Sequence, residues 1–287
     1  MLQRLKRIKE ILDHPANRSN RVAAFARYLR WNIGRRLLDQ ADYAITIAPN
    51  ATVILSNHEN YATLVYTCRL YDFDEMKFLI DYLRPGDVFG DFGSNVGVYS
   101  VLAGSLGATV VSVEPVPGTY TRLEDNLRLN SVRGQAVKCG LADARGTLSF
   151  TSTLGGMNHV ATPRDTDTIQ VDVMTADDLV AMTGLLPRVL KIDVEGFELP
   201  LLRGSAALLP QVEAIIIELN GSGRPYGHAD EDVHAFLLAA GFGCFDYAPD
   251  THTLTPRDDF QREKFNSLYV KLGALDAVRS RIDRRPH

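Results

Sequence analysis

The sequence predicts an α/β protein built on a doubly wound, mostly parallel sheet. From residue 87 onward, short apolar runs alternate with segments of helical periodicity, the pattern of repeated strand–helix units. Four of the apolar runs end in an acid, and a glycine-containing turn joins the first run to a helix. With 287 residues, the chain can hold one such domain and an N-terminal extension.

The first unit has the pattern of a nucleotide-type site. Residues 87–92 form a short, mostly apolar run, as expected of a central parallel strand. Gly93, Asn95 and Gly97 then make a turn that can adopt positive φ and let a ligand approach the backbone. Residues 98–106 have helical spacing, so the turn opens onto a helix N-terminus.

The acid Asp91 discriminates between ligands. A dinucleotide fingerprint needs Gly-x-Gly-x-x-Gly and a pyrophosphate on the helix N-terminus, whereas this turn has only Gly93 and Gly97 and carries no Lys or Arg. Asp91 would repel a pyrophosphate and attract the ammonium and sulfonium of S-adenosylmethionine. A second acid, Glu114, ends the run 109–114 and is placed to accept ribose hydroxyls.

Further strands are predicted at 135–139, 189–193, 212–218, 244–247 and 268–270. Four strands end in an acid: Asp91, Glu114, Asp193 and Glu218. The carboxyl ends of parallel strands share the edge where ligands bind. Each acid alone could be a helix cap or a solvated strand end, but four together are costly without a cation nearby. A cationic cofactor would remove this cost.

Residues 147–174 interrupt the alternation. Strands are predicted at 147–150 and 169–173, and a glycine-containing stretch at 154–160 separates them. This insertion is either a lid or a surface connection, and Asn158 and His159 within it favour the lid.

Positive charge is concentrated at the N-terminus. Residues 1–40 hold ten Lys/Arg and three acids (+7), whereas the remainder holds 21 and 32 (−11). Such an acidic body argues against a nucleic-acid partner. Three isolated cysteines without a C-x-x-C pair, no apolar run of about 20 residues and no signal-peptide core predict a cytoplasmic protein without structural zinc.

Two amphipathic helices are predicted before residue 40. Their apolar positions are Leu2, Leu5, Ile8, Ile11 and Leu12 in the first, and Val22, Phe25, Leu29, Ile33 and Leu37 in the second. They could lie on an anionic membrane, but packing on the α/β domain or on a partner subunit is favoured. With a hairpin at 43–47 and 52–55, they form a predicted unit 1–70 that covers one edge of the sheet. The predicted domain spans 71–273, and 274–287 is a basic tail.

Four segments together resemble the FkbM-family methyltransferases: residues 86–97, 113–130, 190–198 and 216–220. The resemblance covers about residues 70–272, and its most specific part is Lys-Ile-Asp-Val-Glu-Gly from Lys191 to Gly196. It implies S-adenosylmethionine dependence, a Rossmann-like class I sheet of seven strands, and methylation of hydroxyl oxygens of sugars and natural products. Gly90 and Ser94 depart from the family pattern, and the first 70 residues lie outside it.

The expected cofactor residues are Asp91, Gly93, Ser94, Asn95, Gly97, Glu114 and Asp143. Asp91 is assigned to the ammonium, the turn to the methionine part and Glu114 to the ribose. Asp143 is a candidate for the adenine amino group, although a turn-forming Asp is an alternative.

The acceptor alcohol must lose a proton to a base, for which Asp193 and Glu195 are the first choice and the loop histidines His159 and His228 the rivals. Asp193, Glu218 and Asn220 could hold Mg²⁺, as acids do in catechol-type enzymes, but a metal-free site is favoured. The alternatives to a methyltransferase are an NAD-dependent oxidoreductase and a non-catalytic module. A polyketide or peptide hydroxyl is an alternative acceptor. The oligomeric state is open, and the N-terminal helices are the expected contact surface.

Overall fold

The computed structural model of the chain describes residues 2–37, 42–56, 59 and 61–283. Within these ranges the central sheet has eight strands, in the order β12 (Thr253–Arg257), β11 (Phe242–Ala248), β13 (Asn266–Lys271), β10 (Ala214–Glu218), β9 (Val189–Ile192), β3 (Val88–Phe92), β4 (Thr109–Val113) and β5 (Gly134–Val137). The five strands from β10 to β5 are parallel, and β13 runs antiparallel to both of its neighbours.

This order confirms the predicted doubly wound α/β sheet of the class I methyltransferase type. The prediction of seven strands is one short, because β12 adds an eighth strand at the edge next to β11. Its sequence, Thr-Leu-Thr-Pro-Arg, contains Pro256, which usually argues against a strand. Pro is tolerated here because one side of an edge strand needs no ladder N–H.

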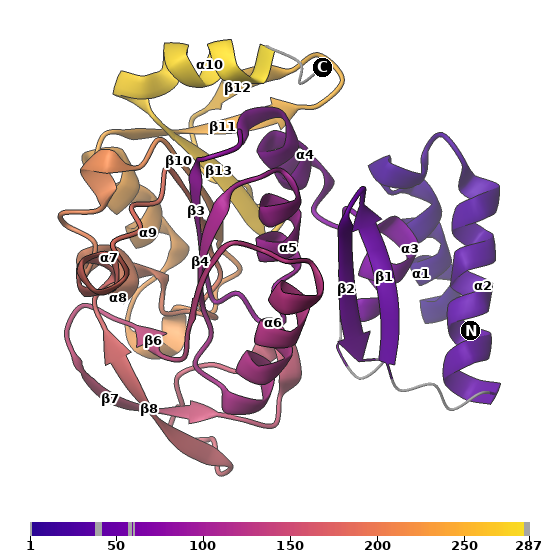
Figure 1. Ribbon diagram of the computed structural model, residues 1–287, viewed down its shortest axis with the longest axis horizontal. Coiled ribbons are helices and arrows are strands. Elements are labelled where there is room, and N and C mark those ends of the chain that lie inside the picture. Colours follow the sequence, from indigo (N-terminus) through magenta and orange to yellow (C-terminus); the bar gives the residue numbers. More distant parts are fainter. Residues whose placement is uncertain (1, 38–41, 57–58, 60, 284–287) are drawn as a thin grey trace.

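Helices cover both faces of the sheet (Figure 1). On one face lie α4 (Phe73–Tyr82), α5 (Val98–Ser105) and α6 (Pro117–Leu129), and on the other α7 (Ala176–Thr183), α8 (Glu198–Arg203) and α9 (Asp230–Ala239). Successive residues of β10 enter opposite cores, since Ile216 packs with α4 and α5 whereas Ile215 and Ile217 pack with α8 and α9. Burial on both faces explains the continuous apolar runs in the sequence.

The insertion forms a second, three-stranded sheet of β6 (Gly140–Leu141), β8 (Thr168–Met174) and β7 (Gly146–Thr151). Its two longer strands are those predicted. In Figure 1 this sheet lies below β4, beside the carboxyl ends of the parallel strands.

The N-terminal unit comprises α1 (Leu2–Asp13), α2 (Arg21–Leu37), the hairpin β1 (Asp42–Ala48) and β2 (Ala51–Ser56), and α3 (Ala62–Cys68). The hairpin packs on α5 and α6 and does not cover an edge of the sheet as predicted. The reason is a pair of side-chain amides on α6. Asn126 Oδ1 accepts the Ile54 N–H and Asn130 Oδ1 accepts the Thr52 N–H, each at 2.8 Å.

Helix α2 packs with the face opposite to the predicted one. Its buried residues include Ala24 and Trp31, and the Trp31 ring lies 4.4 Å from the Tyr43 ring and 5.0 Å from the Tyr66 ring, centroid to centroid. The predicted apolar positions Val22 and Phe25 are exposed together with Leu29 and Ile33. The expectation that this stripe packs on the α/β domain is therefore wrong.

Most of the segment 274–287, predicted as a basic tail, forms α10 (Leu275–Asp283), which packs on α4, whereas 284–287 lie outside the described residues. Val278 and Ile282 are buried there, and Arg281 forms an ion pair with Asp87. Local sequence favours a tail because charged residues dominate it, whereas two apolar residues four positions apart suffice to anchor a short helix. Within the described ranges, no helix combines the length and the apolar character needed to span a bilayer.

Candidate active site

The glycine turn after β3 brings two strand ends together. Gly93 has φ +81°, and a Cβ added there would lie 1.8 Å from the carbonyl oxygen of Asp193. A Cβ on Gly97, which has φ +86°, would lie 2.6 Å from Cδ1 of Leu123 on α6. Gly93 thus allows the carboxyl ends of β3 and β9 to approach. Gly97 serves the packing of α5 on α6 and lines neither of the cavities described next.

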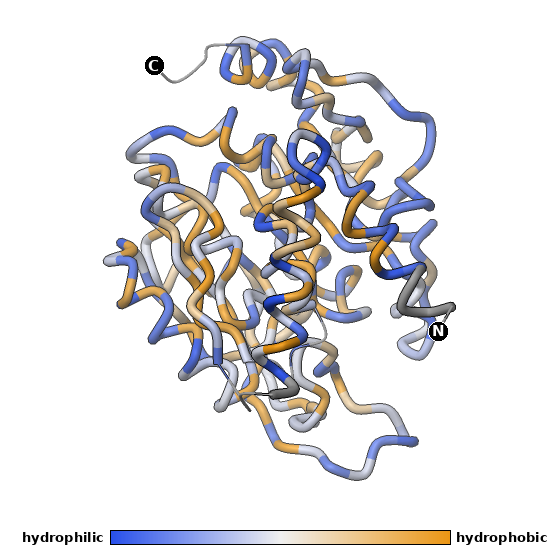
Figure 2. The backbone as a smooth tube through the Cα atoms, turned by 90° about the vertical axis from the view of Figure 1, so that its right-hand side faces the viewer, coloured by the Kyte–Doolittle hydropathy of each residue, from blue (hydrophilic) through white to orange (hydrophobic). Residues whose placement is uncertain are grey.

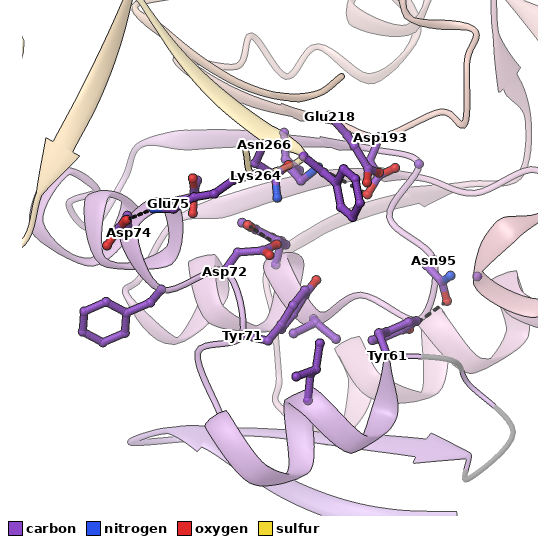
Figure 3. A pocket seen from close by; sticks show the side chains of 18 of the residues that line it. Tyr61, Tyr71, Asp72, Asp74, Glu75, Asn95, Asp193, Glu218, Lys264 and Asn266 are labelled. Atoms are coloured by element: carbon purple, nitrogen blue, oxygen red, sulfur yellow. Dashed lines mark hydrogen bonds and ion pairs between the residues drawn. The ribbon is translucent and has the colours of Figure 1, made fainter. Parts of the chain in front are cut away.

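Two cavities meet at this turn. The larger has a volume of about 560 Å³ (Figure 3) and the smaller one of about 70 Å³. Both are lined by Gly93, Asn95, Gly156, Asp193 and Glu195. Because they share these lining residues, the two cavities are neighbours at the strand ends. A ligand in one cavity would therefore lie next to a ligand in the other.

Glu114 lines the small cavity. Its carboxylate accepts the backbone N–H of Asn95 at 3.1 Å and of Val116 at 2.9 Å, which fixes its orientation. Burial raises the pKa of Glu114 to about 7. Apolar side chains, including Leu141 and Phe150, form much of the remaining wall. The small cavity therefore combines an apolar surface with one oriented carboxyl group.

Asp91 is 2% exposed and lines the large cavity. It accepts a hydrogen bond from Ser100 Oγ at 2.5 Å, and Ser100 Oγ lies 2.7 Å from Ser112 Oγ. Burial raises the pKa of Asp91 to about 6. On the neighbouring strand β9, the residue in register with Asp91 is Lys191.

Lys191 is a buried cation that the sequence reasoning missed. It is 3% exposed, its Nζ lies 3.3 Å from Asp193 Oδ2, and it lies 5.6 Å from the centroid of the Tyr99 ring. Burial opposes its charge, but the carboxyl groups of Asp193 and Glu218 outweigh burial and raise the pKa of Lys191. The feature of the sequence that could have identified this residue is a single Lys inside an otherwise apolar predicted strand. Lys191 supplies a cation to the strand-end acids from the chain itself, which weakens the argument that these acids indicate a cationic cofactor.

Asp193 and Glu218 lie side by side at the ends of β9 and β10 (Figure 3). Burial, and then the Asp193 charge, raise the pKa of Glu218, which donates a hydrogen bond to Asp193. Burial opposes ionisation of Asp193, but Lys191 and this hydrogen bond hold its pKa below the ordinary value. The two carboxyl groups therefore titrate as a pair, and the Lys191 ammonium at 3.3 Å favours the negative charge on Asp193.

Glu195 completes a group of three carboxylates. Its backbone has φ +50°, and burial, followed by the nearby Asp193 charge, raises its pKa to about 8. One oxygen each of Asp193, Glu195 and Glu218 lies within 4.8 Å of the others, so these residues could hold a cation. Asn220, the third metal ligand considered from the sequence, is exposed, and its Oδ1 accepts the Ser222 N–H. Glu195 takes its place in the group.

The far side of the large cavity combines aromatic rings with hydrogen-bond acceptors. Tyr61 and Tyr71 have ring centroids 6.0 Å apart, and Tyr61 OH donates to Asn95 Oδ1. Asp72 accepts Tyr99 OH at 2.8 Å and is also hydrogen-bonded by Asn266. Asn266 is 9% exposed, and among the described residues its Oδ1 has no partner. This part of the cavity, here called the acceptor arm, is lined by Tyr61, Tyr71, Asp72, Glu75, Phe265 and Asn266.

Three sequence candidates lie outside both cavities. Asp143 is exposed and lines neither. The ring nitrogens of His159 lie 2.9 Å from the Met157 carbonyl oxygen and 3.4 Å from Asp165, so its side chain is engaged within the insertion. His228 also lies outside both linings. The insertion nevertheless borders the site, through Gly156 and Asn158. The direction of loop side chains depends on tertiary contacts that local sequence does not encode.

Ser94 lines the large cavity, but its Oγ donates to the Val113 carbonyl at 3.1 Å. Of the seven predicted cofactor residues, the structure thus brings Asp91, Gly93, Ser94, Asn95 and Glu114 to the two cavities.

An open sheet with a glycine turn after its central strand, and acids at four strand ends around one bipartite cleft, defines a protein of the class I methyltransferase type. The family model for the methyltransferase FkbM domain matches residues 91–244, more than half of the chain. The chain belongs to this family, which confirms the resemblance found in the sequence.

Three named proteins are similar in sequence to the chain. The chain is 29% identical to the hexuronic acid methyltransferase AglP of Haloferax volcanii, over 53% of this chain and 64% of that protein. It is 32% identical to Methyltransferase 1 of Beauveria bassiana, over 58% and 78%. It is 28% identical to the 31-O-demethyl-FK506 methyltransferase FkbM of Streptomyces tacrolimicus, over 56% and 74%. The match thus spans less than two thirds of the archaeal relative.

Replacing Gly93 should disrupt the site. Gly93→Ala should lower the free energy of unfolding by about 3 kcal/mol or more, because its Cβ would overlap the Asp193 carbonyl oxygen and its φ is positive. The control Gly118→Ala, in α6 with no atom within 4 Å of the new Cβ, should stabilise by about 0.4–1 kcal/mol. Chemical denaturation measures both. Equal stability of the two variants would contradict this account of the turn.

Proposed function

We propose that the protein is an S-adenosylmethionine-dependent O-methyltransferase that acts on a hydroxyl of a sugar, a glycan or a glycosylated natural product. The observation that carries this proposal is the position of Asp193, an ionised carboxylate that lines both the small cavity and the large one. A base at that junction can reach an acceptor in one cavity beside a cofactor that extends from the other. The names of the archaeal and bacterial relatives support methylation of a hexuronic acid and of a natural product.

The residues present fit S-adenosylmethionine. The oriented carboxyl of Glu114 beside an apolar wall suits a ribose and its base, and Asp91 in the large cavity suits the positively charged methionine end. A pyrophosphate fits poorly, because the turn presents acids and the described cation beside it, Lys191, is paired with Asp193. This donor set disfavours the NAD-dependent oxidoreductase. Intact acids at the strand ends disfavour a non-catalytic module.

Bound S-adenosylmethionine would supply a methyl group attached to a sulfonium sulfur. As the acceptor oxygen bonds to this methyl carbon, the carbon–sulfur bond breaks and the sulfur leaves as a neutral thioether. The chain has two tasks: to orient the acceptor oxygen and to take its proton. Asp193 takes the proton. A carboxylate of lowered pKa suffices, because the oxygen becomes strongly acidic as the new bond forms. Lys191 keeps Asp193 ionised until then, and Glu218 orients it through their hydrogen bond.

The acceptor arm favours a hydroxyl-rich molecule. Asp72 can accept hydrogen bonds, as can the Oδ1 of Asn266, which has no partner among the described residues. The rings of Tyr61 and Tyr71 offer apolar surface for the C–H face of a sugar. Three buried thiols without disulfides support a reducing, cytoplasmic location.

Cofactor binding and base chemistry can be tested together. Calorimetry should show binding of S-adenosylmethionine and none of NADH, and labelled methyl groups should transfer to members of a panel of methyl glycosides. Asp193→Asn should lower turnover by about 100-fold or more while S-adenosylhomocysteine still binds. The exposed Asp143→Asn is the matched control and should retain turnover. Saturation by NADH without uptake of S-adenosylmethionine would overturn the proposal.

Metal dependence is a separate question. Because the Asp193 carboxylate is already balanced by Lys191 and the proton on Glu218, we expect turnover to continue in EDTA. Loss of turnover in EDTA, restored by added Mg²⁺, would instead assign the three carboxylates to a metal.

Removing the buried cation should change the pH dependence. Lys191 lowers the pKa of Asp193, so Lys191→Met raises that pKa and the ionised base is lost at a higher pH. The acidic limb of the kcat/KM profile should move upward by about one pH unit or more. Lys191→Arg keeps the charge and should leave the limb near its original position. Identical limbs in all three proteins would remove Lys191 from this role.

A further inference from the structure

Helix α2 carries an exposed apolar stripe on the side that faces away from the rest of the chain. Its members are Val22, Phe25, Leu29 and Ile33, which are 82%, 40%, 46% and 51% exposed. Their spacing of three or four residues places them on one face of the helix. On the opposite face Ala24 is buried, and Trp31 contacts Tyr43 of the hairpin and Tyr66 of α3. Figure 2, which looks onto this side, shows apolar and polar segments alternating along α2.

Basic side chains border the stripe. Arg21 at the start of α2 and Arg30 along it lie on the two sides of the stripe, and Arg18 lies just before the helix; all three are exposed. The described acids of this region are already paired: Asp13 lies 3.0 Å from Arg21, and Glu10 lies 3.8 Å from Arg7. Residues 1–40 carry a net charge of +7. The surface is therefore apolar at its centre and cationic at its margins.

We propose that this face of α2 docks on an anionic lipid bilayer. A helix with an apolar stripe flanked by Arg lies in the membrane interface, where the apolar side chains enter the acyl boundary and each nearby basic residue contributes about 1 kcal/mol against anionic lipid. A second copy of the chain fits less well, because a two-fold contact would bring the Arg rows of both copies together. Nucleic acid would meet the apolar stripe where it needs phosphate contacts.

The surface also borders the active site. Arg7 of α1 and His14 line the large cavity, and α1 packs against α2. Docking through α2 would thus bring the wall of the large cavity formed by Arg7 and His14 close to the bilayer.

Vesicle co-sedimentation of the full chain tests the proposal. The protein should bind phosphatidylcholine vesicles that contain phosphatidylglycerol and bind pure phosphatidylcholine weakly. Binding should fall when salt rises from about 0.1 M to about 1 M, which shortens the Debye length from about 10 Å to about 3 Å. The double variant Phe25→Glu, Leu29→Glu should lose affinity by about ten-fold or more, because it removes apolar insertion and adds two like charges.

The control places the same charges elsewhere. Met182 and Leu186 are 57% and 46% exposed at the end of α7 and just after it, and Met182→Glu with Leu186→Glu should bind vesicles as the unchanged protein does. Thermal melts of both double variants should match. Equal loss of binding in the two variants would overturn the proposal. So would a concentration-dependent dimer that dissociates in Phe25→Glu, Leu29→Glu while vesicle binding is absent.

Discussion

The site depends on one buried ammonium among carboxylates. Lys191 enters the carboxyl edge of the sheet from β9, in register with Asp91 and 3.3 Å from Asp193. Burying any of these charges alone would cost several kcal/mol, so each is tolerated because the others are present. The same arrangement sets the chemistry, since the cation keeps Asp193 ionised and the proton remains on Glu218. The same interactions that allow these charges to be buried therefore also keep the proposed base ionised.

This cluster forms where the backbone just after β3 passes close to the backbone just after β9. Gly93 makes the approach possible, since any side chain there would meet the Asp193 carbonyl oxygen. The turn that follows orients Asn95, whose N–H fixes Glu114 and whose side chain accepts Tyr61 OH. One glycine thus connects the small cavity, the strand-end acids and the acceptor arm. The neighbouring Gly97 has a different purpose, helix packing, although the sequence presents the two glycines as equivalent.

Local sequence patterns predicted the strands and the acids at their ends. They did not predict side-chain positions that depend on contacts between residues distant in sequence. Strands and their terminal acids follow from apolar periodicity, and parallel topology brings those acids to one edge. Asp193, the nearest partner of Lys191, is only two residues away, but Asp91 and Glu218 come near Lys191 through strand pairing, which the sequence does not show. Asn266 meets Asp72 across nearly 200 positions of sequence. Asp143 and His159 are polar loop residues whose direction depends on tertiary contacts, and the structure turns them away from the cleft.

Helix α2 shows how periodicity can identify a face without saying what covers it. The stripe has the spacing of the buried face of a helix, and its members are Val22, Phe25, Leu29 and Ile33. The residue of α2 that is buried in the core is instead Trp31, on the opposite face. A single indole packed at a tilt against the rings of Tyr43 and Tyr66 can outweigh several smaller apolar side chains, because a large ring buries more area and fits an aromatic site. An aliphatic stripe left uncovered between arginines persists in water only at a cost. A bilayer with negative charge would relieve that cost, and the rest of the acidic chain would face away from it.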